Sequence, residues 1–493
     1  MALQNKKQVT ALTLGLMTIA SVVSLRGLPM MAAEGLSMIF YILFATFVFL
    51  LPASMVSAEL GGAFGGESGG VYTWVKAAFG PRFGFTAIWL QWIQNVVWYP
   101  TVLGYAAACL AYLFMDPKLA QSGTYTGVII LVVYWLATFI ALRGSNAVNM
   151  VTKFGVVVGT LLPGLLIIIL GMFWVDQGYP IAFLGGDVVG AETVTNIENA
   201  VHSRFFPHLS GLGSVAFLAG IVLLFAGVEV QAVQAADMKK PETQFPMAML
   251  LASVVIILLF LLGSLAVAVA IPAKEISLTA GLMQAFTIML DKMHLSFLTP
   301  ILGLLMAFGA IGGVMSWVTG PSRGLLATAK EGEMPPIMAR TNKAGAPTTL
   351  LYIQAVIVTI LASLYLVIKD VSVAFFILSA MTATLYLVMY MLMFAAAITL
   401  RITRPDLPRA YKVPGGMAGM CLIAGLGFLG VAFAFVVGFF PPSNLPVGNP
   451  SYYVLLVASG LVLFTGMPII IQCMKKPSWK PQVPNNSSQV SPQ

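Results

Sequence analysis

The sequence has 493 residues, of which 59% are hydrophobic and only 9% are charged, and its formal net charge is +8. This composition lies far from that of soluble globular proteins and excludes that class. The apolar segments are continuous and about 20 residues long, the length at which a helix crosses the hydrocarbon core of a bilayer, whereas a barrel needs shorter alternating segments. The chain is therefore predicted to be an all-α membrane protein.

Twelve apolar segments are predicted to cross the membrane. They lie near residues 11–31, 36–60, 83–114, 125–142, 148–174, 211–235, 245–271, 297–328, 349–368, 372–400, 419–440 and 451–473. No small-residue cleavage site follows the first segment, so we expect it to remain in the mature protein. Residues 1–475 are expected to form one transmembrane domain, and residues 476–493, rich in Pro, Gln, Asn and Ser, a disordered cytoplasmic tail.

The distribution of Lys and Arg predicts the orientation of these segments. With the N-terminus inside, most basic residues fall on the inner side, as expected for cytoplasmic loops. Both termini are therefore predicted to be cytoplasmic, in the inner (plasma) membrane of a bacterial-type cell. Because the cations are scattered over separate loops, the positive charge indicates topology in a lipid bilayer and no nucleic-acid partner.

One carboxyl group, that of Glu229, lies in the middle of the apolar run 212–236. An ionisable residue at that depth is costly without partners or a water-lined cavity, so it marks a functional site. Small and polar residues interrupt this segment and also the first segment. Paired interruptions at the start of two five-span halves are typical of inverted-repeat transporters, which bind ligands between discontinuous helices. The alternative is that the Gly and Ser residues only allow close helix packing.

Several motifs resemble those of the amino acid, polyamine and organocation (APC) transporter superfamily. They are Gly227-Val228-Glu229, followed by Pro241 and Pro246, and the stretch 69–74, GGVYTW. The stretches 316–324 (SWVTGPSRG), 342–347 (NKAGAP) and 80–85 (GPRFGF) resemble the bacterial glutamate/γ-aminobutyrate antiporters within this superfamily. The similarity extends from about residue 10 to residue 475. It implies twelve transmembrane helices, a five-plus-five inverted repeat with broken helices 1 and 6, and exchange of amino acids by alternating access.

The resemblance also implies a substrate site, built from the two interruptions and from later spans. Its expected residues are Thr18, Ile19, Ala20, Ser21, Val22, Val23, Ser24, Leu223, Phe225, Ala226, Gly227, Glu229, Trp317, Tyr386 and Tyr390. Trp317 matches the aromatic residue that closes over the substrate in such transporters. Tyr386 and Tyr390 match a pair of tyrosines, and their spacing of four puts both on one helix face. Structural packing is the alternative for the tyrosines.

Lys153 matches a lysine that takes the place of a sodium ion in proton-coupled and exchange members of the superfamily. A partly buried ammonium group there is suited to proton coupling, and Glu229 is a second candidate for that role. The alternative is that Lys153 extends its charge to the nearby membrane surface.

Arg26 and Gly313 depart from the pattern of the antiporters. Arg26 stands where they have a tyrosine, and Gly313 stands where they have an acidic residue, so both changes make the site more positive. We expect Arg26 to pair with a carboxylate of the substrate or with Glu34, because a guanidinium offers two parallel donors to either. An external-vestibule position with a structural partner is the alternative.

The sequence therefore predicts an amino acid antiporter, with glutamate/γ-aminobutyrate exchange as the best single assignment. Leu223 argues against arginine exchange, since it replaces an aromatic residue that would stack on a cationic side chain. A proton-coupled symporter of neutral amino acids and a non-transporting amino acid sensor remain alternatives. The Gly-rich stretch 65–70 lacks the Lys-Ser/Thr of a phosphate loop, so we expect no enzyme activity, no catalytic residues, no cofactor and no metal. The protein is expected to act as a monomer or homodimer.

Overall fold

The computed structural model describes residues 10–64, 70–184, 205–207, 211–232, 238–368, 370–442 and 449–479. Within these residues, ten helical segments are long and apolar enough to cross a membrane. They are built from α3 (Ser37–Ala45) with α4 (Leu51–Ala63), α6 (Pro81–Leu113), α7 (Gly123–Leu142), α8 (Ser145–Val156) with α9 (Leu162–Asp176), α13 (Pro241–Ala270), α15 (Thr299–Lys330), α16 (Thr348–Ala362) with α17 (Leu364–Val367), α18 (Val371–Thr403), α19 (Gly416–Val437) and α20 (Pro450–Cys473). Two further crossings consist of shorter pieces, so the predicted twelve-helix all-α fold is confirmed.

The first and sixth crossings are interrupted, as the sequence predicted. The first consists of α1 (Ala11–Val22), a 3₁₀ turn at Leu25–Gly27 and α2 (Leu28–Ala32). The sixth consists of α11 (Phe217–Leu224) and α12 (Val228–Ala232). Each crossing is therefore made of two half-helices with a break between them.

The two broken crossings pack against each other in opposite directions. The side chain of Leu224 lies against Gly27, and the side chain of Met30 lies against Gly220. Moving forward along α2 therefore means moving backward along α11, while α1 lies against α12. This antiparallel pairing of half-helices is the arrangement typical of an inverted repeat, and it brings the two breaks together.

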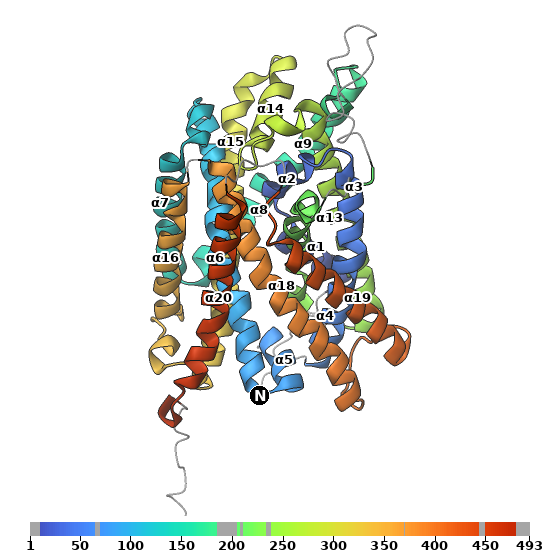
Figure 1. Cartoon of the computed structure of the whole chain (residues 1–493), viewed down its shortest axis with the longest axis vertical. Helices are drawn as coiled ribbons and strands as arrows, with labels where there is room; N and C mark the ends of the chain where they lie inside the picture. The colour runs from blue at the N-terminus through green and yellow to red at the C-terminus, as the bar shows by residue number, and fades with distance from the viewer. Residues whose placement is uncertain are drawn as a thin grey trace, which may run out of the picture.

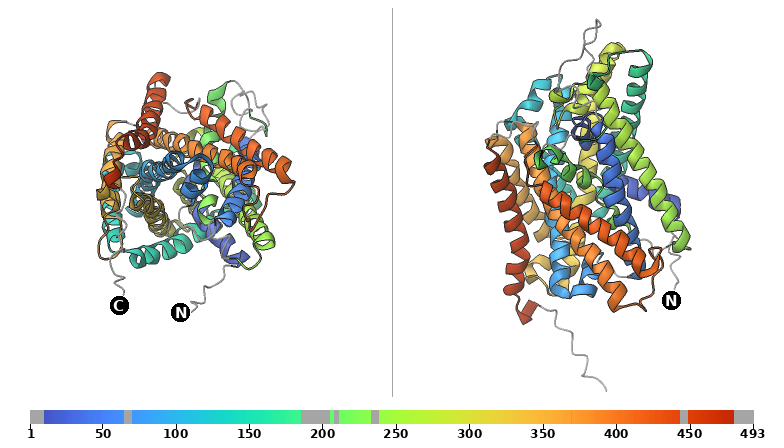
Figure 2. Two further views of the ribbon diagram at one scale, coloured as in Figure 1. Left: turned by 90° about the horizontal axis from the view of Figure 1, so that it is seen from below. Right: turned by 45° about the vertical axis from the view of Figure 1, so that its right-hand side comes forward.

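Helices α6 and α18 are the most buried of the ten spans, and they contact each other and form the centre of the bundle with α15. The outer helices α19 and α20 instead expose most of their apolar side chains, as lipid-facing helices do. The bundle is shown from the side in Figure 1 and in the right panel of Figure 2, and from below in the left panel of Figure 2.

Close approach of α15 to the π-helical turn Val157–Leu161, between α8 and α9, depends on glycine. A Cβ atom on Gly159 would lie 2.4 Å from the Cα atom of Gly309. Small residues of this kind let membrane helices cross at short distance. Both glycines also border the central cavity described below.

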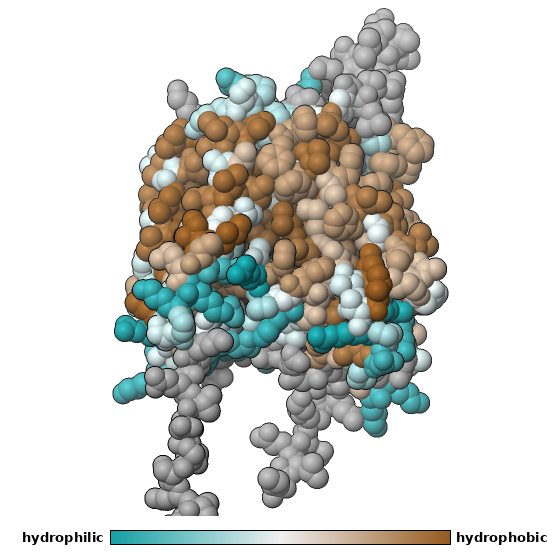
Figure 3. Space-filling view, turned by 60° about the horizontal axis from the view of Figure 1, so that its bottom comes forward, coloured by the Kyte–Doolittle hydropathy of each residue, from teal (hydrophilic) through white to brown (hydrophobic). Residues whose placement is uncertain are grey.

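Basic and other hydrophilic residues gather at one end of the bundle. Helix α5 (Val71–Phe79) lies at one end and α14 (Gly281–Lys292) at the other (Figure 1). We call the end with α5 the basic face; it carries Lys76, Arg401, Arg409 and Lys475. Figure 3 shows hydrophilic residues gathered there, beside a broad hydrophobic band. This division matches a protein whose middle lies in lipid.

The predicted disordered tail lies mostly outside the described residues, because residues 480–493 are not among them. Its first residues differ from the expectation, since Pro477–Trp479 forms a 3₁₀ turn after α20.

Candidate functional site

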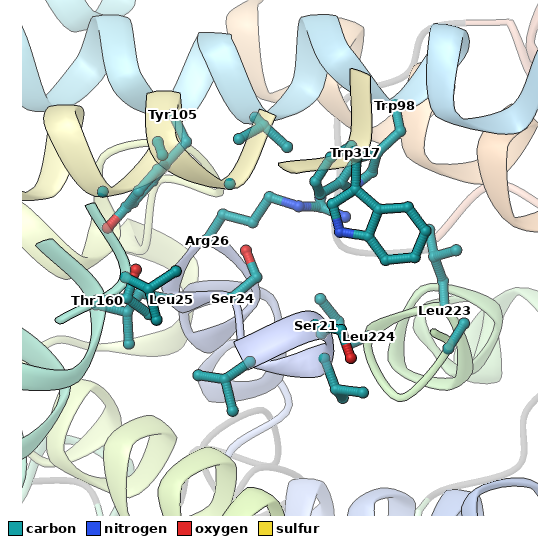
Figure 4. Close-up of a pocket in the computed structure, with 18 of the residues that line it drawn as sticks. Ser21, Ser24, Leu25, Arg26, Trp98, Tyr105, Thr160, Leu223, Leu224 and Trp317 are labelled. Carbon is teal, nitrogen blue, oxygen red and sulfur yellow. The ribbon is translucent and has the colours of Figure 1, made fainter. Parts of the chain in front are cut away.

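A cavity lies beside the breaks in the first and sixth crossings. It is lined by these two segments and by residues of α6, α8, α15, α18 and the π-helical turn between α8 and α9. The lining residues include Ser21, Val22, Val23, Ser24, Leu25, Arg26, Gln94, Asn95, Trp98, Tyr105, Thr160, Leu223, Ala226, Gly313, Trp317 and Tyr386. Figure 4 shows the labelled side chains converging on this space from different helices. Most of the residues predicted for the substrate site therefore meet at one place.

Arg26 extends across this cavity from the 3₁₀ turn Leu25–Gly27, between the two half-helices of the first crossing (Figure 4). Its side chain is only 3% exposed, and its guanidinium carbon lies 5.6 Å from the ring of Trp98 and 5.7 Å from the ring of Phe375. The buried Nε atom has no hydrogen-bond partner. Among the described residues, no carboxylate forms an ion pair with Arg26, and the expected alternative of a pair with Glu34 is wrong.

Trp317 covers the break in the sixth crossing. Its indole ring packs edge-on against Trp98, with the ring centroids 6.2 Å apart. A Cβ atom on Gly227 would lie 3.2 Å from Trp317 and 3.4 Å from the carbonyl oxygen of Ser21. Gly227 has a φ of +117°, in the region that favours glycine, so the backbone can turn here directly beneath the indole. Trp317 thus occupies the place expected of an aromatic lid, and its closing role stays a prediction.

Glu229 is buried and is held by three neutral donors. Tyr386 donates a hydrogen bond to its Oε1 atom and Tyr390 donates one to its Oε2 atom. Gln91 donates a further bond from Nε2 to Oε1 at 3.0 Å, and the Gly227 amide donates to the Tyr390 hydroxyl at 2.9 Å. The two tyrosines therefore lie on one face of α18, as their spacing predicted. Within the described residues the carboxyl group has hydrogen-bond partners but no cation.

A second cavity lies on the other side of this cluster. It is lined by Glu229 and Gln91 together with Gly70, Arg323 and other residues near the basic face. Tyr386, in contrast, lines the central cavity. The hydrogen-bonded cluster of Glu229, Gln91 and Tyr386 consequently forms part of the wall between the two cavities.

Some of the predicted site residues point elsewhere. The Thr18 hydroxyl donates to the Leu14 carbonyl at 2.9 Å, and the Phe225 ring packs edge-on against Phe260 with centroids 5.4 Å apart. Ile19 is also buried away from the cavity. These three residues do not line the cavity in this structure, because a broken helix presents only one side to it, and their part in substrate binding stays an untested prediction. The side chain of Ala20 lies outside the described residues.

Lys153 differs from the expectation as well. It lies in α8 with its side chain exposed, so the assumption that it is partly buried is wrong. The residues of this crossing that line the cavity are Val156, Gly159 and Thr160, further along the chain. Coupling through Lys153 stays an untested prediction.

Three amide side chains on α6 belong to the site but were missed in the sequence. Gln91, Gln94 and Asn95 are all buried, and the side-chain amides of Gln94 and Asn95 both donate to the main-chain carbonyl of Gln91, at 3.2 and 2.8 Å. Their spacing of three and four in an otherwise apolar span was a readable signal, because polar residues inside the membrane are rare and face the bundle interior.

Comparisons with known proteins agree with this geometry. A family model described as amino acid permease matches residues 6–462. An uncharacterized transporter of Legionella pneumophila is 36% identical, over 94% of this chain and 96% of its own length. A glutamate/γ-aminobutyrate antiporter of Lactococcus lactis is 31% identical, over 95% of this chain and 90% of its own, and a probable agmatine/putrescine antiporter of the same species is 27% identical, over 78% of each. The family model covers nearly the whole chain, including both broken crossings and the cavity beside them, and the chain therefore belongs to the amino acid permease family of multi-pass membrane transporters.

Proposed function

We propose that the protein is an antiporter that exchanges glutamate for γ-aminobutyrate by alternating access. The observation that carries this proposal is the cavity beside two broken helices, into which the buried guanidinium of Arg26 extends without an ion-pair partner among the described residues. Breaks in membrane helices leave backbone N–H and C=O groups free to bind the carboxylate and the ammonium of an amino acid. A cavity with such groups and one extra cation suits an amino acid with a second acidic group.

The relative from Lactococcus lactis supports the choice of substrates, because it is named a glutamate/γ-aminobutyrate antiporter and aligns over almost all of both chains. The second cavity supports alternating access. Its lining residue Glu229 accepts a hydrogen bond from Tyr386, which lines the central cavity, so the two cavities meet at the same cluster. Movement of the broken crossings relative to α6 and α18 would open one cavity as it closes the other.

We infer the orientation from the charge of the two ends. Basic residues are retained on the cytoplasmic side of membrane proteins, so the basic face is assigned to the cytoplasm. Both termini then lie in the cytoplasm, and substrate enters the central cavity from outside. The membrane is assigned as the plasma membrane.

Counterflow in proteoliposomes tests this function. Vesicles containing the purified protein are preloaded with γ-aminobutyrate, glutamate, glutamine or buffer, and uptake of radiolabelled glutamate is measured. Glutamate uptake that requires internal γ-aminobutyrate or glutamate supports exchange. Uptake into buffer-loaded vesicles driven by a pH gradient would instead establish proton symport, and saturable glutamate binding without any uptake would establish a sensor.

A further inference from the structure

Arg26 is a buried charge that has no anionic partner among the residues the structure describes. Burying an ionised group costs free energy unless an opposite charge and hydrogen bonds compensate it. Arg26 is 3% exposed, its Nε atom has no partner, and within the described chain its guanidinium lies against the rings of Trp98 and Phe375. Those rings supply part of the compensation through cation–π attraction. They supply no anion, although the guanidinium borders a cavity that can admit one.

We infer that the missing anion is the side-chain carboxylate of the substrate, and that Arg26 determines specificity for amino acids with a distal acidic group. The inference rests on the proposed function, because it takes the central cavity as the substrate site. It adds that Arg26 recognises the side chain of the substrate, whereas backbone groups at the breaks bind the α-amino and α-carboxyl groups.

One residue can recognise both exchanged molecules, because they share the same distal carboxylate. Glutamate and γ-aminobutyrate differ only in the α-carboxylate, which γ-aminobutyrate lacks. Both keep an ammonium group and a carboxylate that are separated by a chain of three carbons. A residue that bound only the α-carboxylate would serve glutamate alone. A cation that binds the distal carboxylate serves both molecules.

The setting of Arg26 favours a carboxylate over other groups. A guanidinium is a planar fork whose parallel N–H groups match the two oxygens of a carboxylate. Contacts with two aromatic rings limit the positions of this fork, so less freedom is lost when the ligand binds. The same buried cation repels diamines and cationic amino acids, which gives selectivity against them as well.

Substitutions at Gly313 provide a second, independent test of the role of the Arg26 charge. It lines the central cavity with Arg26, and a Cβ atom built on it meets no atom within 4 Å. A small side chain at this position therefore projects into open space. Asp and Asn have nearly the same size, so the pair Gly313→Asp and Gly313→Asn differs at this point only by one negative charge in the cavity.

The first experiment measures binding without requiring transport. Thermal unfolding of the purified wild type, Arg26→Gln and Arg26→Lys is followed with glutamate, γ-aminobutyrate or glutamine. In the wild type, glutamate and γ-aminobutyrate should stabilise the protein at lower concentration than glutamine does. Arg26→Gln should raise the half-effective concentrations of both acidic ligands about 10- to 100-fold, the range expected for loss of a hydrogen bond between charged groups. Arg26→Lys, which keeps the charge but loses the fork, should fall between. An Arg26→Gln protein that still prefers glutamate over glutamine to the wild-type extent would overturn the inference.

The second experiment keeps Arg26 in place, so it remains decisive if the Arg26 variants do not fold. Compared with Gly313→Asn, Gly313→Asp should weaken the binding of glutamate relative to that of glutamine by roughly 10-fold, because the new carboxylate competes with the substrate for the guanidinium. Equal ligand preferences in the Asp and Asn variants would contradict a role for Arg26 in reading the carboxylate.

Failure of the inference and failure of the proposed function give different results. If acidic ligands stabilise the wild type through Arg26 but no counterflow occurs, the carboxylate site stands and the antiport function is wrong. If counterflow of glutamate occurs but its preference over glutamine is unchanged in Arg26→Gln and in Gly313→Asp, the function stands and the inference is wrong.

Discussion

Arg26 and Glu59 are both buried charged residues inside this membrane protein, but their surroundings differ. Glu59, in α4, is 2% exposed and is surrounded by donors. Arg401 donates to its two oxygens at 2.5 and 2.6 Å, Arg409 lies 3.0 Å from Oε1, and the amide of Val413 donates to Oε2 at 2.7 Å. Arg26 has a similar burial and no carboxylate partner in the described chain.

The comparison shows that burial of a charge does not by itself mark a ligand site. Around Glu59, two guanidiniums and a backbone amide compensate the carboxylate and join α4 to the end of α18 and the segment that follows it at the basic face. That arrangement is expected to stabilise the fold. Around Arg26, the compensation is left incomplete beside a cavity, which is what a site needs if the ligand is to complete it. Glu229 lies between these cases, since it accepts three hydrogen bonds and, among the described residues, all of its donors are neutral.

The largest effect is expected from Glu59→Gln. Removing this carboxylate leaves Arg409, whose side chain is 3% exposed, as a buried cation without its anion. Breaking a buried ion pair from one side costs about 3–5 kcal/mol, so the apparent melting temperature in detergent should fall sharply. Glu331→Gln, at an exposed ion pair with Lys76, is the matched control and should change it little. Retained stability in Glu59→Gln together with altered substrate preference would reverse the roles of the two sites.

Arg26→Gln should have the opposite pattern. Affinity for acidic ligands should fall about 10- to 100-fold, while the melting temperature without ligand should stay equal or rise, because an incompletely compensated buried charge has been removed. Thermal unfolding with and without glutamate measures both quantities on one sample. A large loss of stability in the ligand-free variant would assign Arg26 a structural role like that of Glu59.

The tyrosines on α18 should give intermediate effects and separate two functions of the Glu229 cluster. Tyr390→Phe removes a bond to Glu229 and an acceptor for the Gly227 amide, so it should lower stability by about 1–3 kcal/mol. Tyr386→Phe removes one bond to Glu229 but also changes the lining of the central cavity, so it should alter glutamate exchange more than stability. Melting temperature and counterflow of each variant test this, and identical profiles for the two variants would argue against the division.

The smallest effect is expected at the Lys76–Glu331 pair on the basic face, where the two atoms lie 2.9 Å apart. Desolvation raises the pKa of Glu331, but hydrogen bonds from Tyr72 and Lys76 and the charge of Lys76 outweigh it, so the pKa lies below its ordinary value. A carboxyl group with a lowered pKa stabilises the folded protein above its unfolded-state pKa, and the contribution is lost as the pH falls through the folded-state value.

Because both side chains are largely exposed, that contribution should not exceed about 1 kcal/mol. Wild type and Glu331→Gln should therefore differ slightly in melting temperature at pH 7 and converge below about pH 4. A difference that grows as the pH falls would mean that the pKa of Glu331 is raised in the folded protein, opposite to this prediction.

The architecture could be predicted from the sequence because bilayer thickness fixes the length of an apolar span. The breaks could be predicted too, since Gly227 and the residues before Pro29 interrupt two such spans at corresponding positions. The orientation of single side chains could not be predicted with the same success. Phe225 lies in one break and Thr18 lies in α1, about one turn before the other break, and both turn away from the cavity, because which side of a half-helix faces the ligand depends on its packing partners.

The partners of the buried charged residues could be predicted even less, because they are set by tertiary structure. The sequence indicated that Glu229 and Arg26 are unusual, but the tyrosine partners of Glu229 follow from how α6 and α18 meet the sixth crossing. That no described carboxylate pairs with Arg26 could be seen only in the folded chain. Lys153 was expected to be partly buried and is exposed. The Glu59 network was missed because its arginines are far away in the sequence; Arg401 lies 342 residues after Glu59.

The most direct test of a substrate site completed by Arg26 is an experimental structure of the protein with glutamate bound. We predict ligand density in the central cavity beside the two breaks, with the side-chain carboxylate about 3 Å from the Arg26 guanidinium and the α-amino and α-carboxyl groups at the helix ends. Density for glutamate in the cavity near Arg323 and Glu229, or in the central cavity with its side-chain carboxylate turned away from Arg26, would contradict this prediction.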